Sequence, residues 1–246
     1  MGGGVPRTIL QSHDNTVLAN TATLNRIEAC MRFEGELHYT KVDSICGKLI
    51  HLVPMNDTCT EAQLDWASLK ISNFALSVLI QDDKDKARNL ITSTTDVGVY
   101  GSLRGHLFEN LAHECIMLGG KFRVRNLNDG SISEVSFPKR QMKRFTKVNE
   151  AEVEKYNVPN SKTFQSVDSI VPPYDLFQMT VSRHHGIKEE ELKNLEDILD
   201  KGHINFYFVT LLEHFEDFKM AKLGDDWNSR IHQKVIGISL STIPSG

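Results

Sequence analysis

The fold is decided by residues 101–137, which read GSLRGHLFEN LAHECIMLGG KFRVRNLNDG SISEVSF. In the first half of this stretch, apolar residues recur at helical spacing at Leu103, Leu107, Leu111 and Ile116. This spacing predicts a helix, with Ser102 as its N-cap. Gly119-Gly120 predicts the end of the helix, because glycine adopts the left-handed conformation that closes many helices without steric cost.

The second half of the stretch is a predicted β-hairpin. Its first strand alternates over residues 121–127, with Phe122, Val124 and Asn126 on one face and Lys121, Arg123 and Arg125 on the other. Asn128-Asp-Gly130 is a strong hairpin turn, and residues 132–137 form the returning strand.

The rest of the chain alternates between predicted strands and helices. Strands over 165–171 and 176–182 flank Pro172-Pro173, a helix covers 189–199, and residues 204–211 form an apolar strand of the kind buried in a sheet centre. This order is typical of an α/β fold. We expect a restriction-endonuclease-like mixed central sheet, flanked by helices, over residues 98–246. Residues 1–97, which include a strand over 48–53, are expected to form a small α+β N-terminal region.

Three polar residues interrupt these apolar elements. Glu109 lies within the predicted helix, Asp168 is embedded in an apolar strand, and Gln178 follows in the next strand. A carboxylate buried in a strand is costly unless it is paired or binds a metal. Mg²⁺ or Mn²⁺ accepts carboxylate and amide oxygens as ligands, and such ions activate water and neutralise the charge of a phosphodiester. The three residues therefore predict a metal site for phosphodiester hydrolysis.

Each of these residues also has an ordinary interpretation. Glu109 is compatible with a solvent-facing helix position and Asp168 with a turn cap or an arginine pair. Gln178 and Thr180, two positions apart, are compatible with polar positions on an edge strand. His185, which follows that strand, is compatible with proton relay or phosphate contact, and equally with simple packing.

Basic residues are frequent between Lys121 and Lys147. The candidates for contacts with a DNA backbone are Arg123, Arg125, Arg140, Lys143 and Arg144. Arg123 and Arg125 share a strand face and can reach successive phosphates. The ordinary interpretation is a solvated edge strand whose charge prevents aggregation. Since the net charge is −4, any nucleic-acid surface is confined to a local patch.

The composition is that of a globular protein, with 246 residues of which 40% are hydrophobic and 24% charged. The four cysteines have no C-x-x-C spacing, which disfavours a zinc ribbon or a thioredoxin-type site and favours reduced thiols. No apolar run is long enough for a transmembrane helix, so no membrane partner is expected. The amino terminus lacks the pattern of a secretory signal, and its abrupt start predicts a piece of a larger protein.

Five segments stand out together: GHLFE at 105–109, GGKFRVR at 119–125, VDSI at 167–170, LFQMTVS at 176–182, and His185. They resemble the C-terminal domain of Crinkler effectors and of the related retrotransposon-hot-spot proteins, over about residues 98–220. In that family the domain is described as a nuclease of the PD-(D/E)xK type, with a restriction-endonuclease-like fold.

The resemblance implies a role for each polar residue. Glu109 corresponds to the helical acid, Asp168 to the strand aspartate and Gln178 to the acid of the last motif. Thr180 stands where the motif usually carries a lysine, which orients water and stabilises developing charge. Lys162 is the leading candidate to replace that lysine, and without a replacement the activity is weak or lost.

The resemblance also implies partners and a location. Gly3-Gly-Val-Pro-Arg7 resembles the end of a P-loop NTPase module. Residues 1–97 are then a connector with an NTPase remnant at 1–10, of winged-helix type in one alternative, and an upstream NTPase module is a candidate partner. The chain has no G-x-x-x-x-G-K-[ST] motif of its own. Family membership implies secretion and delivery into host cells, often into nuclei.

The leading prediction is therefore the Mg²⁺-dependent DNA endonuclease domain of a host-translocated virulence effector, with little sequence specificity. One alternative is a weak or inactive nuclease-fold module that binds DNA or a host nuclear protein. Another is a regulatory piece of an NTPase machine.

Overall fold

A computed structural model describes residues 50–54, 62–66, 91, 101–160, 164 and 166–240. The chain divides into two compact units, Met1–Leu107 and Phe108–Gly246, whereas the sequence predicts a boundary between residues 97 and 98. In the first unit, β1 (Ile50–Pro54) and β2 (Ala62–Trp66) pair antiparallel, which confirms the strand predicted over 48–53. The predicted NTPase remnant at 1–10 lies outside the described residues.

Helix α6 (Gly101–Leu118) is the predicted helix. It begins at Gly101, so Ser102 lies in its first turn and is not its N-cap. Its second half buries a stripe at helical spacing, formed by Phe108, Leu111, Ala112 and Ile116. The helix ends as predicted, because Gly119 has a φ of +73° and its N–H donates to the carbonyl oxygen of Ile116 at 3.1 Å. No helix in the described part of the chain is long and apolar enough to cross a membrane.

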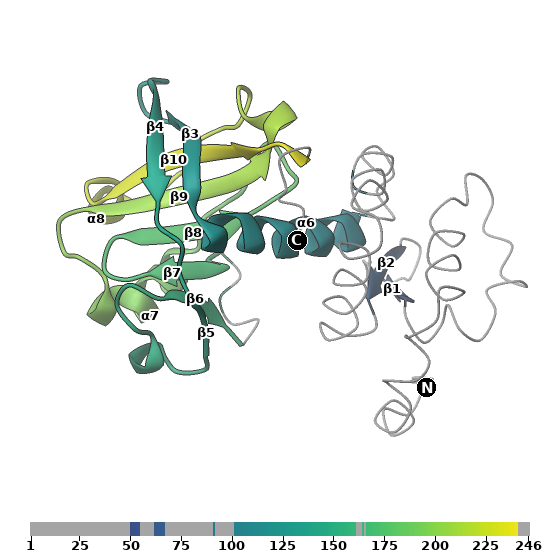
Figure 1. Ribbon diagram of the computed structural model, residues 1–246, viewed down its shortest axis with the longest axis horizontal. Helices are drawn as coiled ribbons and strands as arrows, with labels where there is room; N and C mark the ends of the chain where they lie inside the picture. The colour runs from purple at the N-terminus through teal and green to yellow at the C-terminus, as the bar shows by residue number, and fades with distance from the viewer. Residues whose placement is uncertain are drawn as a thin grey trace, which may run out of the picture. The chain divides into compact units, whose positions relative to one another are not determined.

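The second unit is built on an eight-stranded mixed sheet (Figure 1). Its strands are β3 (Gly120–Asn126), β4 (Ile132–Phe137), β5 (Met142–Phe145), β6 (Tyr156–Pro159), β7 (Ser169–Val171), β8 (Asp175–Met179), β9 (Ile204–Leu211) and β10 (Ile231–Ile238). The order across the sheet is β4-β3-β10-β9-β8-β7-β6-β5. Strands β8, β9 and β10 run parallel, and β7 and β3 run antiparallel to their neighbours in this group.

Several predicted elements are confirmed. The hairpin of β3 and β4 turns at Gly130, and β9 lies inside the sheet between β8 and β10. The helix predicted over 189–199 is α7 (Glu189–Leu195), continued by the 3-10 turn η4 (Glu196–Ile198). The sheet is mixed, as expected, but three of its strands, β5, β6 and β10, have no counterpart in the sequence prediction.

Each face of the sheet has its own packing. On one face, Leu192 and Leu195 of α7 share a core with Phe206 and Phe208 of β9 and with Trp227 of the short helix α8 (Asp225–Asn228). We call this the α7 face.

The opposite face, the α6 face, carries an aromatic cluster. Phe177 lies 5.2 Å from Tyr207, 5.6 Å from Phe137 and 6.0 Å from Tyr156 between ring centroids. The second half of α6 joins this cluster, because His113 contacts Tyr156 edge-on. Strand alternation sorts consecutive residues between the two faces.

The strand directions bring several segment ends to one edge of the sheet. The carboxyl ends of β8, β9 and β10 lie at the same edge because the three strands are parallel. Strand β7 is antiparallel to β8, so its first residue lies at that edge too. We call it the carboxyl edge, and it is where the candidate site forms.

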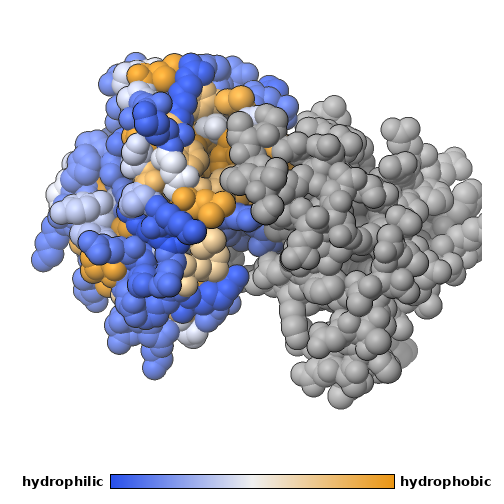
Figure 2. All heavy atoms as spheres, viewed as in Figure 1, coloured by the Kyte–Doolittle hydropathy of each residue, from blue (hydrophilic) through white to orange (hydrophobic). Residues whose placement is uncertain are grey.

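The visible surface of the second unit is mainly hydrophilic, with hydrophobic residues gathered in a smaller area of that face (Figure 2). The most exposed large apolar side chains come from separate segments: Ile132, Met142, Val153, Tyr174, Leu212 and Met220. Edge strand β4 carries Glu134, which pairs with Lys121 of β3 at 3.0 Å. Charge of this kind protects a sheet edge from pairing with other chains.

Gly119→Ala is expected to destabilise the second unit by more than about 2 kcal/mol, because the new methyl group needs backbone to move. A Cβ at Gly119 would lie 2.5 Å from the carbonyl oxygen of Phe137. Gly130 has the same φ of +73° but no atom within 4 Å of such a Cβ. Gly130→Ala therefore costs only the left-handed strain, about 1 kcal/mol. Urea unfolding of both variants measures the difference, and equal losses would contradict the steric argument.

Candidate functional site

Asp168 is held at the carboxyl edge by two hydrogen bonds to β8. Its backbone N–H donates to the carbonyl oxygen of Phe177 at 2.9 Å. Its Oδ2 accepts a hydrogen bond from the backbone N–H of Met179 at 2.6 Å. The carboxylate thus takes the place of a main-chain acceptor in the ladder, which fixes it close to the plane of the sheet, where β7 begins.

Glu109 of α6 lies near enough to Asp168 for its charge to act on the Asp168 carboxyl. Burial raises the pKa of the Asp168 carboxyl well above its usual value of 3.8, and the negative charge of Glu109 raises it further. The hydrogen bond from Met179 opposes this shift, and Glu191 adds to it. Two neighbouring carboxylates in a partly dry site stay together at neutral pH at a cost, unless they share a proton or hold a cation.

Glu191 of α7 is a neighbour of Asp168 that the sequence analysis missed. Its side chain is 6% exposed, and its Oε2 accepts a hydrogen bond from the backbone N–H of Ser166 at 2.6 Å. The hydroxyl of Ser166 in turn accepts from the backbone N–H of Lys188 at 2.9 Å. Glu191 therefore fastens the loop that ends at Asp168. It belongs to a run of three glutamates, which in a sequence is typical of a solvated helix start.

A buried chain of side chains lies beside Glu109 on the α6 face. Nε2 of His113 is 3.8 Å from Oε1 of Glu109, one helical turn away. Nδ1 of His113 is 2.8 Å from the hydroxyl of Tyr156, which accepts a hydrogen bond from Ser169 at 2.7 Å. Burial raises the pKa of Tyr156 far above its usual value, and the charges of Asp168 and Glu109 raise it further, so the phenol stays protonated.

Gln178 lies on the α7 face. Phe177 points into the aromatic cluster of the α6 face, so the next residue points away from it, to the side of Leu176 and Phe208. The side chain of Gln178 is 4% exposed, and its Oε1 has no hydrogen-bond partner in the described structure. Gln178 therefore points away from the face on which Glu109 lies, and its role as a metal ligand stays a prediction.

The other predicted catalytic residues have different surroundings. Thr180 is buried, and its hydroxyl accepts a hydrogen bond from the backbone N–H of Ser182 at 3.1 Å. Nδ1 of His185 donates to the carbonyl oxygen of Gly186 at 2.8 Å, in the loop between β8 and α7. Lys162 lies outside the described residues. The catalytic roles of these three residues stay predictions.

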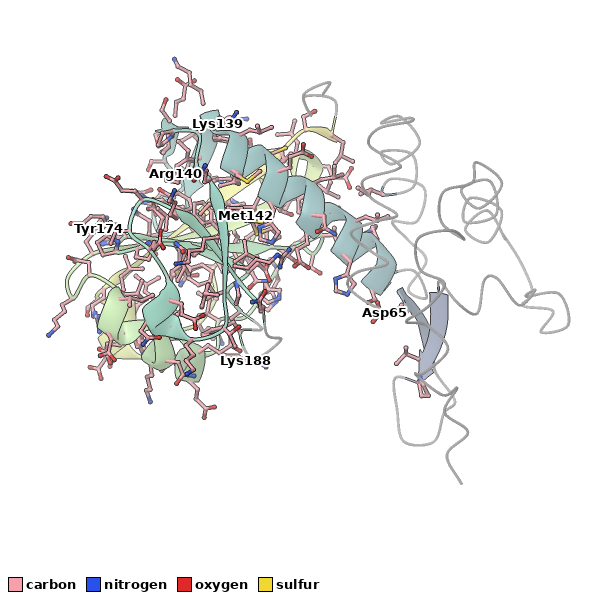
Figure 3. The ribbon with its side chains drawn as sticks, turned by 60° about the horizontal axis from the view of Figure 1, so that its bottom comes forward. Asp65, Lys139, Arg140, Met142, Tyr174 and Lys188 are labelled. Carbon is pink, nitrogen blue, oxygen red and sulfur yellow. The ribbon has the colours of Figure 1, made fainter. Side chains whose placement is uncertain are left out.

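The predicted DNA-binding residues separate into two groups. Arg123 and Arg125 belong to β3, whereas Lys143 and Arg144 belong to β5. The two strands are six strand spacings apart in the sheet, which is roughly 29 Å along it. Arg140 precedes β5 and lies beside the C-terminal end of α6 (Figure 3). There its backbone N–H donates to the carbonyl oxygen of Met117 at 2.9 Å.

Arg125 has a structural task. Its Nε and Nη2 donate to the carbonyl oxygen of Phe215 at 3.0 and 2.8 Å, and Nη2 also donates to that of Phe218 at 2.9 Å. Arg123 lies over the Phe215 ring at 4.9 Å and pairs with Glu216 at 3.1 Å. Both arginines share a strand face, as predicted, but a phosphate at Arg125 would have to compete with two backbone carbonyls.

The donor set of the carboxylate pair suits a hard divalent ion. Among the described residues, no three His, Cys, Asp or Glu side chains come together as a metal-binding group. Mg²⁺ is, however, commonly held by one or two carboxylates while it keeps several waters for itself and for substrate phosphates. Glu109 and Asp168 are the two carboxylates at this place, and the pKa of Asp168 is raised first by burial and then by the charge of Glu109.

Fold and site together define an α/β protein with a mixed sheet and a carboxylate pair at the sheet edge. Comparison with known proteins gives two relatives from Phytophthora infestans. Crinkler effector protein 16 is 24% identical over 226 residues, which cover 84% of this chain and 35% of that protein. Crinkler effector protein 15 is 24% identical over 230 residues, which cover 84% of this chain and 36% of that protein.

These matches support a Crinkler-like relation at low identity. The chain spans about a third of the length of the curated relatives it matches. No family model matches the chain. No solved structure matches it, so the restriction-endonuclease-like fold stays a prediction.

Asp168→Asn is expected to stabilise the protein at pH 8 without divalent ions, because it removes a carboxylate whose pKa is raised by burial and by the charge of Glu109. The asparagine oxygen can still accept from Met179. A raised pKa means that the folded state binds the proton more tightly, so ionisation lowers stability as pH rises. The gain in melting temperature should therefore shrink as pH falls toward 4.

Asp200→Asn is the matched control. Backbone N–H groups of Gly202 and His203 lower the pKa of this exposed carboxyl, so its ionised form is favoured in the folded state. This variant should lower the melting temperature at pH 8. If Asp168→Asn lowered it as well, Asp168 would be an ordinary hydrogen-bonded carboxylate.

Arg125→Gln is expected to destabilise the protein by about 1–3 kcal/mol, because buried carbonyl oxygens lose charged donors. Arg123→Gln should cost less than about 1 kcal/mol, since its ion pair with Glu216 is exposed. Arg123→Gln is instead expected to weaken DNA retention in a gel-shift assay. Normal DNA retention by Arg123→Gln would remove β3 from the predicted DNA surface.

Proposed function

We propose that this chain is a metal-dependent endonuclease domain that hydrolyses phosphodiester bonds of DNA. The observation that carries the proposal is the approach of Glu109 to Asp168, from a helix and from the start of a strand, at one edge of a mixed sheet. Carboxylates with perturbed pKa values in such a position are candidates for a functional site. The resemblance of the surrounding motifs to Crinkler-type nuclease domains supports the same chemistry.

Each residue then has a task. A bound Mg²⁺ supplies an activated water and compensates the charge that develops on the phosphate. Glu109 and Asp168 hold the ion, with Gln178 as a further predicted ligand. Asp168 is oriented by the amide of Met179, and its loop is fastened by Glu191. Arg123 holds the DNA backbone through its phosphates, which gives affinity without sequence preference.

The Crinkler-like relation supports a biological setting for this activity. Both relatives are named as effector proteins. We include in the proposal that the domain is the toxic part of an effector that acts on DNA inside a host cell, in the nucleus, with an NTPase module as a candidate partner. The whole relatives are about three times as long as the matched segment, so their further regions are free to supply delivery.

The test is cleavage of supercoiled plasmid DNA in Mg²⁺ or Mn²⁺, with EDTA as the control. Wild-type protein should nick the plasmid only with a divalent ion. Asp168→Asn and Glu109→Gln should each reduce the rate at least about 100-fold, because several kcal/mol of transition-state stabilisation depends on the ion. Asp200→Asn should cleave like wild type. Equal rates in wild type and Asp168→Asn would remove the carboxylate pair from the chemistry.

A second candidate function is DNA binding without cleavage. Thr180 occupies the place where the resemblance implies a lysine, and its hydroxyl is engaged with the backbone of Ser182. Among the described residues, the charged side chains that shift the pKa of Asp168 are two carboxylates, Glu109 and Glu191. If the protein retards DNA in a gel but leaves it intact with both metals, this second function is selected.

A further inference from the structure

The pair of carboxylates depends on how Glu109 is oriented on its helix. Glutamate has three rotatable bonds, and at a half-buried position it can turn toward water. Its described neighbour on α6 is His113, whose Nε2 lies 3.8 Å from Oε1 of Glu109. This distance is longer than a hydrogen bond, so the contact is electrostatic. Its effect depends on which way the imidazole ring faces.

The orientation of the ring is set by Tyr156. Ser169 donates its hydroxyl hydrogen to the phenol oxygen of Tyr156. The phenol hydrogen is then available for Nδ1 of His113, at 2.8 Å. This hydrogen bond fixes the plane of the imidazole ring, so that Nε2 faces Glu109. These contacts connect Ser169 through Tyr156 and His113 to the Glu109 carboxylate.

The position of Tyr156 makes this arrangement rigid. Its side chain is completely buried, and its ring packs against Phe177 of β8. Ser169, its donor, is also completely buried and directly follows Asp168 in the chain. The hydroxyl of Tyr156 therefore connects the helix that carries Glu109 to strand β7, which begins directly after Asp168. Polar partners behind metal-binding carboxylates commonly set their orientation and affinity.

We infer that Tyr156 is a positioning residue, which fixes His113 so that the Glu109 carboxylate is directed toward Asp168 and toward the divalent ion. The inference rests on the proposed function, since it assigns Tyr156 to the same ion site. Tyr156 touches neither the ion nor the substrate in this account. Removal of its hydroxyl should weaken ion binding and leave the fold and the DNA contacts in place.

A matched control is available in the same aromatic cluster. Tyr207 is 3% exposed and stacks on Phe177 from the other side, at 5.2 Å between ring centroids. The carboxylate whose charge raises the pKa of Tyr207 is Asp175, at the opposite edge of the sheet from Asp168. Tyr156→Phe and Tyr207→Phe therefore each remove one buried hydroxyl beside the same ring, but only the first breaks the connection to His113.

The experiment is titration calorimetry with Mn²⁺ on the full chain, together with the melting temperature in EDTA. The expected result is about a tenfold rise in the Mn²⁺ dissociation constant for Tyr156→Phe, the range typical of outer partners of metal ligands. Ser169→Ala should give a smaller rise, and Tyr207→Phe none. A purely structural hydroxyl would lower the melting temperature without changing the Mn²⁺ affinity.

The outcomes separate the two proposals. If wild type binds Mn²⁺ and Tyr156→Phe binds it equally well, the positioning role is overturned and the ion site stands. If wild type does not bind Mn²⁺, the ion site is overturned, and the positioning role with it. Should Tyr156→Phe fail to fold, Ser169→Ala decides, since an unchanged Mn²⁺ affinity in that variant also overturns the role.

Discussion

The approach of two carboxylates, Glu109 and Asp168, is the constraint on which this account of the site depends. Like charges in a partly dry environment repel, so folding brings them together at a cost. The surrounding structure offsets this cost in two ways. Met179 donates a backbone hydrogen bond to Asp168. Helix α6 is anchored by its buried residues Phe108 and Leu111 and by the contact of His113 with Tyr156. A site that binds a cation benefits from this arrangement, because the ion then supplies the missing positive charge.

The edge of the sheet opposite the carboxyl edge carries a second carboxylate whose charge is compensated. At that edge Asp175 is partly buried, and burial raises its pKa. Its neighbours compensate, since Asn205 donates a hydrogen bond at 2.9 Å and the charges of Arg140 and Lys234 lower the pKa again. Around Asp168, the charged side chains that act on its pKa within the described part of the chain are those of Glu109 and Glu191. One edge therefore carries a balanced polar network, and the carboxyl edge carries an unbalanced one, which is the arrangement expected where a ligand completes the charge balance.

The sequence predicted the elements that have strong local signals. Gly119-Gly120, the turn at Gly130 and the apolar run of β9 each specify their structure within a few residues. Strands β6 and β10 do not, because they place Asn157 and Gln233 in the core, where distant backbone partners satisfy both amides. The residues of the site also differ in how strong their local sequence signal is. Glu109 and Asp168 were identifiable as polar residues on apolar elements, but Tyr156 lies on an unpredicted strand. The sheet face on which Gln178 lies depends on strand pairing, which the hydrophobic periodicity of the sequence does not reveal.

The most direct measurement is a crystal structure of the protein soaked in Mn²⁺, with data collected at the manganese absorption edge. We expect an anomalous difference peak between the carboxylates of Glu109 and Asp168, within direct coordination distance of both. We also expect the His113 ring to keep its hydrogen bond to Tyr156. Manganese bound elsewhere, or an empty site in which the two carboxylates share a proton, would contradict the proposed metal site. The relation to Crinkler effectors would then give no support for a catalytic role.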